Sequence, residues 1–313
     1  MGRQGLQKRI GGAITALVTP FRDGALDTVD LMAHVEWQLL SGIDGLLACS
    51  LTGEGPTLTD AERMRIIEIC VELSEGKTPV IVATGTNDTA TTIEETLQAQ
   101  QLGADAAFVT VPYYSKPTQK GVLHHFEQIA AQTDMALIIH SQPSHTAIDL
   151  APATVERLAE IPGIVGIADG SGEISRIDLW RAFLPQQVGL YTSSDAGALG
   201  FTAAGGNGCF STAANVAPRL FHSMQHSAAC GNLDVAHSID RRLRPLFKAL
   251  ARESEPATVK HALAAMRDME PDVRLPLVGI APETATEIQT VIAPFQVDGS
   301  GRLASRQAFR LGL

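Results

Sequence analysis

The chain has 313 residues, of which 45% are apolar and 19% charged, a composition that excludes a disordered chain and allows a large buried core. The formal net charge is −10 and no segment gathers lysine and arginine, which argues against nucleic acid as a partner. No run reaches the roughly 18 to 20 apolar residues that a membrane helix needs, and the basic N-terminus leads into no apolar signal segment. We therefore expect a cytoplasmic protein with no membrane partner.

Eight short apolar runs, each followed by a helical pattern, succeed one another along the chain. Expected helices at 29–40, 61–73 and 93–102 separate the first runs, with start signals at Asp27-Thr28, Thr59-Asp60 and Thr91-Thr92. Continuous apolar runs are typical of a parallel sheet buried on both faces, and eight such units close a barrel. The runs begin at Ala13, Gly45, Pro79, Ala106, Ala136, Ile164, Val188 and Gly206.

These repeats predict an α/β fold, a (β/α)8 TIM barrel that spans residues 1–228. Residues 229–313 are expected to form a C-terminal helical extension packed on the barrel, with a last helix near 282–295 and a polar tail after it. The four cysteines lie far apart without a Cys-x-x-Cys motif, so we expect buried free thiols rather than a metal or redox site.

In such a barrel the reactive groups lie at the carboxyl ends of the strands and in the loops that follow. Five of these strand ends carry polar groups suited to binding or catalysis. They are 50–54, 112–114, 140–145, 168–172 and 193–195.

Four sequence blocks resemble the dihydrodipicolinate synthase/N-acetylneuraminate lyase family, in the family's order and across nearly the whole chain. They are TALVTPF at 15–21, TGEGPTLTDAER at 52–63, GADAAFVTVPYY at 103–114 and IVGIADGSG at 164–172. The resemblance implies a barrel that joins or splits 2-oxo acids through a lysine Schiff base. It also implies that no metal or other cofactor is needed, and that the protein is a homotetramer built from two tight dimers.

The chain departs from the family pattern at the positions that matter most for chemistry. In the resemblance, Leu51 replaces one of two carboxylate-binding threonines, and His140 replaces a proton-shuttling tyrosine. Ala168 stands where the family has its Schiff-base lysine, and a methyl group cannot attack a carbonyl.

The resemblance assigns the candidate site residues position by position. The catalytic positions are Tyr114, which would reach a neighbouring subunit's site, together with His140 and Ala168. The substrate-binding positions are Leu51, Thr52, Gly53, His145 (in place of the synthase branch's arginine), Asp195 and Phe210.

Several residues have a plainer interpretation that the sequence leaves open. Backbone N–H groups near Thr52 could hold a carboxylate, or Thr52 could simply cap a helix. His140 could act as an acid or base, or be a hydrogen-bonded filler, and Tyr114 could be a packed aromatic residue. Lys116, the one lysine expected near the mouth, is a weak candidate for a substitute nucleophile. A metal site is disfavoured because no ligand spacing is recognisable among His140, His145, Asp169 and Asp195.

Two functional hypotheses follow. The chain is either a diverged, lysine-free member that binds a 2-oxo acid or related carboxylate, without Schiff-base lyase activity, or a lyase or dehydratase with an engineered Lys→Ala change at 168. In the first case turnover is absent or uses non-covalent chemistry through His140 and Tyr114, so the sequence does not decide whether the chain is an enzyme. An engineered trap would change one residue, whereas Leu51, His140 and Ala168 all differ, which favours divergence.

Overall fold

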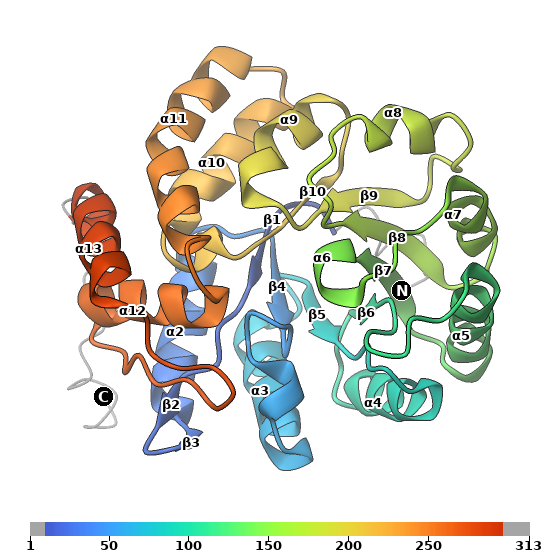
Figure 1. Cartoon of the computed structure of the whole chain (residues 1–313), viewed down its shortest axis with the longest axis horizontal. Coiled ribbons are helices and arrows are strands. Elements are labelled where there is room, and N and C mark those ends of the chain that lie inside the picture. Colours follow the sequence, from blue (N-terminus) through green and yellow to red (C-terminus); the bar gives the residue numbers. More distant parts are fainter. Residues whose placement is uncertain (1–9, 297–313) are drawn as a thin grey trace.

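The computed structural model describes residues 10–296 and confirms the barrel. Eight parallel strands close in the order β1-β10-β9-β8-β7-β6-β5-β4 (Figure 1). A small hairpin of β2 (Phe21–Arg22) and β3 (Ala25–Leu26), which the sequence did not predict, follows the first strand. The barrel strands are β1 (Gly12–Ala16), β4 (Gly45–Ala48), β5 (Val80–Ala83), β6 (Ala106–Thr110), β7 (Ala136–Ser141), β8 (Ile164–Asp169), β9 (Gly189–Thr192) and β10 (Gly208–Ser211).

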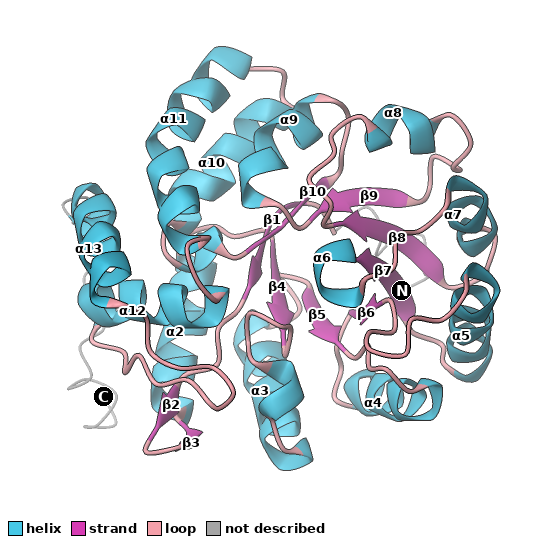
Figure 2. Cartoon of the chain, in the orientation of Figure 1, coloured by secondary structure: helices cyan, strands magenta, loops and turns pink. Residues whose placement is uncertain are grey.

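Helices follow the strands and surround the barrel (Figure 2). Those of the barrel region are α2 (Thr28–Leu40), α3 (Asp60–Ser74), α4 (Thr89–Gln101), α5 (Gln119–Gln132), the one-turn α6 (Pro143–Thr146), α7 (Pro152–Ala159), α8 (Arg176–Arg181), α9 (Ala198–Ala203) and α10 (Pro218–Ala229). Three more helices complete the described chain: α11 (Leu233–Leu250), α12 (Glu255–Arg267) and α13 (Pro282–Gln296). No helix among residues 10–296 is long and apolar enough to cross a membrane.

Local capping explains where the early helices start. The side chain of Asp27 accepts hydrogen bonds from two first-turn N–H groups of α2, and Thr59 forms a capping box with Glu62 at the start of α3. The predicted start of α4 at Thr91-Thr92 is wrong. The helix begins at Thr89, because the carboxylate of Asp88 accepts from Thr91 N and so caps it.

Two apolar layers flank the strands. The larger one lies between the strands and the helices, and the smaller one fills the inside of the barrel with Phe108, Ala168, Tyr191 and Phe210 among others. The Tyr191 ring lies over two strand glycines: a Cβ at Gly166 would approach a ring carbon to 2.6 Å, and one at Gly189 would approach a ring carbon to 2.7 Å. Its hydroxyl donates to Ile10 O at 3.2 Å. Tyr191 therefore fills the amino-terminal half of the barrel, which leaves room for a cavity only at the carboxyl end.

The described part of the C-terminal segment is helical, as predicted, and α13 lies where the last helix was expected. α11 packs against both α10 and α13. The division into two units at residue 228 stays a prediction, since α10 ends at Ala229 and α11 begins at Leu233. The expected polar tail lies outside the described residues. Three cysteines are buried free thiols as expected, but Cys230 is exposed, because it follows α10 at the surface.

Candidate functional site

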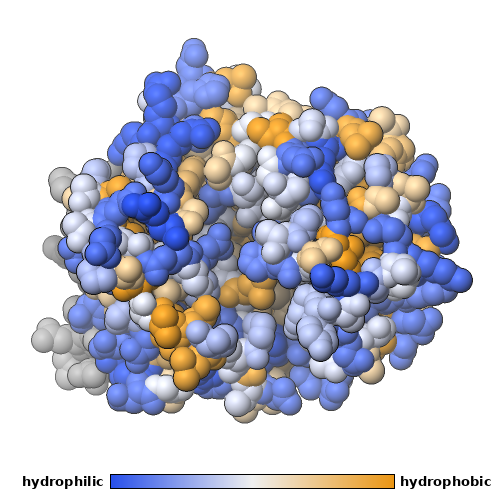
Figure 3. All heavy atoms as spheres, viewed as in Figure 1, coloured by the Kyte–Doolittle hydropathy of each residue, from blue (hydrophilic) through white to orange (hydrophobic). Residues whose placement is uncertain are grey.

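A cavity of about 550 Å³ opens at the carboxyl ends of the strands. Phe108 and Phe210 belong to its floor and to the inner barrel core, with ring centroids 4.5 Å apart. Figure 3 shows this face of the molecule, with apolar residues in the central hollow and both apolar and hydrophilic residues around it. The location matches the expectation for a barrel of this class.

The loop after β4 lines one wall and turns sharply. Cys49 and Glu54 both have positive φ, 58° and 54°, and Glu54 N donates to Leu51 O at 3.0 Å. Gly53 is required here, because a Cβ would lie 2.8 Å from Leu17 O. Among the described residues no acceptor faces the N–H groups of Leu51, Thr52 or Gly53. A tight turn of the backbone therefore offers several N–H donors to an anion.

This turn does not lead directly into a helix. A short 3₁₀ turn over Gly55–Thr57 intervenes, and α3 begins only at Asp60. Thr59 caps that helix, so Thr52 is not a helix cap. Any anion binding at 51–53 therefore relies on the turn's own N–H groups rather than on the dipole of α3.

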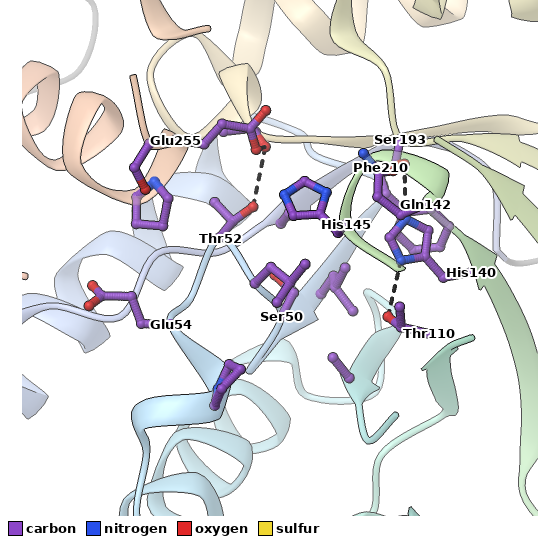
Figure 4. Close-up of a pocket in the computed structure, with 18 of the residues that line it drawn as sticks. Ser50, Thr52, Glu54, Thr110, His140, Gln142, His145, Ser193, Phe210 and Glu255 are labelled. Atoms are coloured by element: carbon purple, nitrogen blue, oxygen red, sulfur yellow. Dashed lines mark hydrogen bonds between the residues drawn. The ribbon is translucent and has the colours of Figure 1, made fainter. Parts of the chain in front are cut away.

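Hydroxyl groups form a chain along the same wall (Figure 4). Thr52 Oγ1 lies 3.2 Å from Thr212 Oγ1, and Thr212 Oγ1 donates to Glu255 Oε2 at 3.0 Å. Ser50 also lines the cavity, yet its buried hydroxyl has no partner among residues 10–296. Leu51, which is 40% exposed, adds an apolar edge.

His140 projects into the cavity from the end of β7 and is held at both ring nitrogens. Nδ1 lies 3.1 Å from Thr110 Oγ1 and Nε2 lies 3.0 Å from Ser193 Oγ. Because Ser193 donates its one proton to Gln142 Oε1 at 3.1 Å, Nε2 must carry the imidazole proton. Burial lowers the pKa of His140 to about 3, so the ring is neutral at physiological pH.

Hydrogen bonds link His140 to the candidate His145 on the rim. From Ser193 the chain continues through Gln142, whose Nε2 donates to Ser144 Oγ at 3.1 Å, and Ser144 Oγ lies 3.2 Å from His145 Nδ1. Both histidines line the cavity. Because this chain of hydrogen bonds includes the Gln142 amide, it can hold the side chains in position but does not readily transfer a proton.

Ala168 is fully buried and lies beside His140 and Tyr191 in the strand register. No lysine lines the cavity within the described part of the chain. Lys116 is exposed on the loop after β6. The sequence analysis overlooked Lys260, which approaches the site loop more closely. Its Nζ donates to Glu54 Oε1 at 2.5 Å and to Asp272 O at 2.7 Å, with both charged side chains inaccessible to solvent.

Comparison with known proteins agrees with this geometry. A model of the Dihydrodipicolinate synthetase family matches residues 9–294. The chain belongs to the dihydrodipicolinate synthetase family. The 4-hydroxy-tetrahydrodipicolinate synthase of Rhizobium meliloti is 41% identical over 278 residues, covering 88% of this chain and 95% of the relative. The one of Methylobacterium radiotolerans is 40% identical over 276 residues, covering 88% and 92%.

Solved structures of the family share the whole fold. The dihydrodipicolinate synthase of Thermotoga maritima is 35% identical with a TM-score of 0.88, covering 91% of this chain and 98% of that one. The chloride-inhibited synthase of Acinetobacter baumannii, solved in complex with pyruvate, is 34% identical with a TM-score of 0.87, covering 90% and 98%.

Four candidate positions named from the sequence do not line the cavity: Ala168, which lies in the inner barrel core, and Tyr114, Gly53 and Asp195. Tyr114 is 87% exposed and points away into solvent, with a positive φ of 68°. Gly53 lies behind the loop, where its carbonyl accepts from Thr19. The carboxylate of Asp195 accepts from Ser211 Oγ and Ala213 N, and burial raises its pKa to about 7. Asp195 thus holds the turn after β10.

Other cavity residues were missed. Thr212 is the last residue of the eighth predicted run and directly follows β10, so the rule that placed candidates at strand ends could have found it. Thr110 ends β6, but the fourth predicted run extended to Tyr114, so its strand end was placed at 112–114 and Thr110 was missed. Glu253 and Glu255 enter from the start of α12 in the C-terminal extension, and no local sequence signal marks them.

Proposed function

We propose that this member of the dihydrodipicolinate synthetase family binds a 2-oxo acid or related carboxylate in the cavity without forming a Schiff base. The observation that carries the proposal is the turn at 51–53, whose N–H groups face no acceptor, beside the unpartnered hydroxyl of Ser50. These donors suit a carboxylate. Ala168 supports the absence of covalent chemistry, because it offers no amine.

The remaining chemistry is non-covalent. A neutral His140 can donate from Nε2 and accept at Nδ1, although both nitrogens already have hydroxyl partners. Leu51 adds apolar surface beside the carboxylate donors. We therefore expect 2-oxo acids with a bulkier, more apolar tail to bind better than pyruvate.

Calorimetry with pyruvate, 2-oxobutyrate, an aromatic 2-oxo acid and related small carboxylates tests the site. Ser50→Ala should weaken binding roughly tenfold, as expected when one hydrogen bond to a charged group is lost. Ser74→Ala is a matched control, since Ser74 is also a buried serine without a partner but lies at the end of α3, away from the cavity. If no carboxylate binds the parent, or if both variants bind alike, the carboxylate site is wrongly assigned.

Borohydride reduction with pyruvate, followed by intact mass, tests the second half of the proposal. The parent should gain no pyruvyl adduct. A stoichiometric adduct would show that another amine, such as Lys116 or Lys260, serves as the nucleophile.

The family resemblance extends the proposal to assembly and location. We propose a cytoplasmic homotetramer in which Tyr114 reaches the neighbouring subunit's cavity. Its 87% exposure in the single chain leaves the Tyr114 side chain available for such a contact. Sedimentation of the full chain, with and without Tyr114→Ser, measures the assembly.

A further inference from the structure

The direction of the hydrogen bonds along the cavity wall is fixed by Glu255. A carboxylate only accepts, so Thr212 gives its single hydroxyl proton to Glu255 Oε2. Thr52, 3.2 Å from Thr212, must then donate its own proton to Thr212 Oγ1. The hydroxyl of Thr52 therefore presents only lone pairs to a ligand. This part of the wall accepts hydrogen bonds and does not donate them.

The charged side chains at the cavity mouth are also hydrogen-bond acceptors. Glu253 and Glu255 line it, and within residues 10–296 no lysine or arginine does. The cations beside the loop after β4 are already engaged. Lys260 and Arg274 are bound to Glu54 and Glu62, and Arg63 donates to Gly55 O and Ala83 O and pairs with Glu95. Glu255 also occupies the first turn of α12, so its own carboxylate takes the interaction that this helix N-terminus would offer to an anion.

Hydrogen-bond donors lie beside these acceptors, in the loop after β4. The N–H groups of 51–53 face no acceptor, and the hydroxyl of Ser50, a residue only 7% exposed, has no partner although Ser50 lines the cavity. Thr52 thus belongs to both regions, with a donor in its backbone and an acceptor in its side chain. A ligand that satisfies both must carry its anionic and cationic groups on neighbouring atoms.

We propose that the ligand of this cavity is a 2-amino acid, with its carboxylate at Ser50 and the N–H groups of 51–53 and its ammonium group at Thr52 Oγ1 and Glu255. The inference rests on the carboxylate site of the proposed function and names its substrate class. Glu255 is a specificity-determining residue, because its charge sets the direction of the Thr52–Thr212 hydrogen bond and attracts the ammonium group. A 2-oxo acid of the same carbon skeleton leaves these acceptors without a donor.

The experiment compares two matched pairs by calorimetry on the full chain: alanine with pyruvate, and 2-aminobutyrate with 2-oxobutyrate. Within each pair only the oxo group is exchanged for an ammonium group. The parent should bind the amino member at least tenfold tighter, as expected for a charge-assisted hydrogen bond against an unsatisfied acceptor.

Two variants and one control test whether Glu255 and Thr212 cause the preference for the amino member of each pair. Glu255→Gln removes the charge, and Thr212→Val breaks the chain so that Thr52 is free to donate; each should shrink the amino preference by about tenfold. Glu253→Gln is the matched control, since Glu253 lines the same mouth but its carboxylate accepts from Ala281 N rather than from the Thr52–Thr212 chain. It should keep the preference.

The outcomes distinguish this inference from the proposed function. If pyruvate binds the parent as tightly as alanine, or if the preference survives in Glu255→Gln and Thr212→Val, the amino-acid assignment is overturned while the carboxylate site stands. If none of the four compounds binds the parent, both are overturned.

Discussion

At the scale of single residues, His140 shows how burial changes the chemistry of a side chain. An imidazole has a pKa near 6.5 in an unfolded chain, whereas burial lowers that of His140 to about 3. Between these values the unfolded chain binds a proton that the folded chain does not. The contribution of His140 to the free energy of unfolding is therefore complete above about pH 6.5 and is lost as the pH falls towards 3.

We expect His140→Gln to lose less stability on acidification than the parent. Between pH 7 and pH 4.5 the difference should be roughly 2 kcal/mol, the free energy linked to one suppressed protonation. Urea unfolding at several pH values measures it. Comparing variant with parent isolates His140 from Asp195, whose pKa, raised by burial to about 7, has the opposite effect on the pH dependence. Parallel pH profiles for the two proteins would contradict a neutral, buried His140.

Gly170 offers a second prediction at this scale. A Cβ there would lie 1.4 Å from Gln142 Oε1 and 2.7 Å from Ser193 Oγ. Gly170→Ala should therefore displace Gln142 and cost about 1 to 3 kcal/mol of the free energy of unfolding. Gly197→Ala is the control, because a Cβ there meets Ser194 Oγ at an ordinary 3.5 Å. Equal stability of the two variants would show that Gln142 can move aside freely.

At the scale of elements, a buried ion pair joins the loop after β4 to helix α12. Lys260 Nζ donates to Glu54 Oε1, and Arg274 N donates to Glu54 Oε2 at 2.8 Å. Lys260 also lies 4.1 Å from the centre of the Phe21 ring. Burial lowers the pKa of Lys260, but the charge of Glu54 counters this effect. The pair therefore fixes the wall that carries Ser50 and Thr52.

Lys260→Met should destabilise the fold by about 3 to 5 kcal/mol, because it leaves the Glu54 carboxylate buried without its cation. Adding Glu54→Gln should restore part of the loss, since the unpaired charge is then removed as well. Lys248→Met, at an exposed position on α11, should change stability by less than about 0.5 kcal/mol. Chemical denaturation compares the four proteins, and a double variant no more stable than Lys260→Met would argue against an ion-pair role.

At the scale of the whole molecule, barrel closure brings the ends of eight strands to one cavity. Ala168 is held in register with His140 on one side and Tyr191 on the other. In the resemblance, this is the position of the family's Schiff-base lysine, and here it carries a methyl group in place of an amine.

Ala168→Lys should restore imine formation with pyruvate, because the backbone would present the new amine to the same cavity. Turnover should stay weak, since Leu51 and His140 still depart from the family pattern. Borohydride trapping with intact mass detects the imine, and aldol-cleavage assays across sialic acid and 2-keto-3-deoxy sugar acids measure turnover. Robust activity in this single variant would favour an engineered lysine loss over natural divergence.

The sequence by itself determined the barrel, its eight strands, two of the three helix starts predicted from capping signals, and the alanine at position 168. Strand and helix patterns and caps such as those of Asp27 and Thr59 depend on neighbours within a few residues. Whether residue 168 carries an amine needs no structure at all. For the same local reason, candidates at strand ends, such as Thr52 and His140, were found in the cavity.

Only the tertiary structure decided what these residues face. Lys260 meets Glu54 across 206 residues, and Glu255 meets Thr212 across 43, contacts that no local pattern encodes. The pKa of His140, the exposure of Cys230 and the outward position of Tyr114 depend on burial. Burial is set by what packs against a side chain from distant parts of the chain, and it appears only once the barrel and its C-terminal helices are assembled.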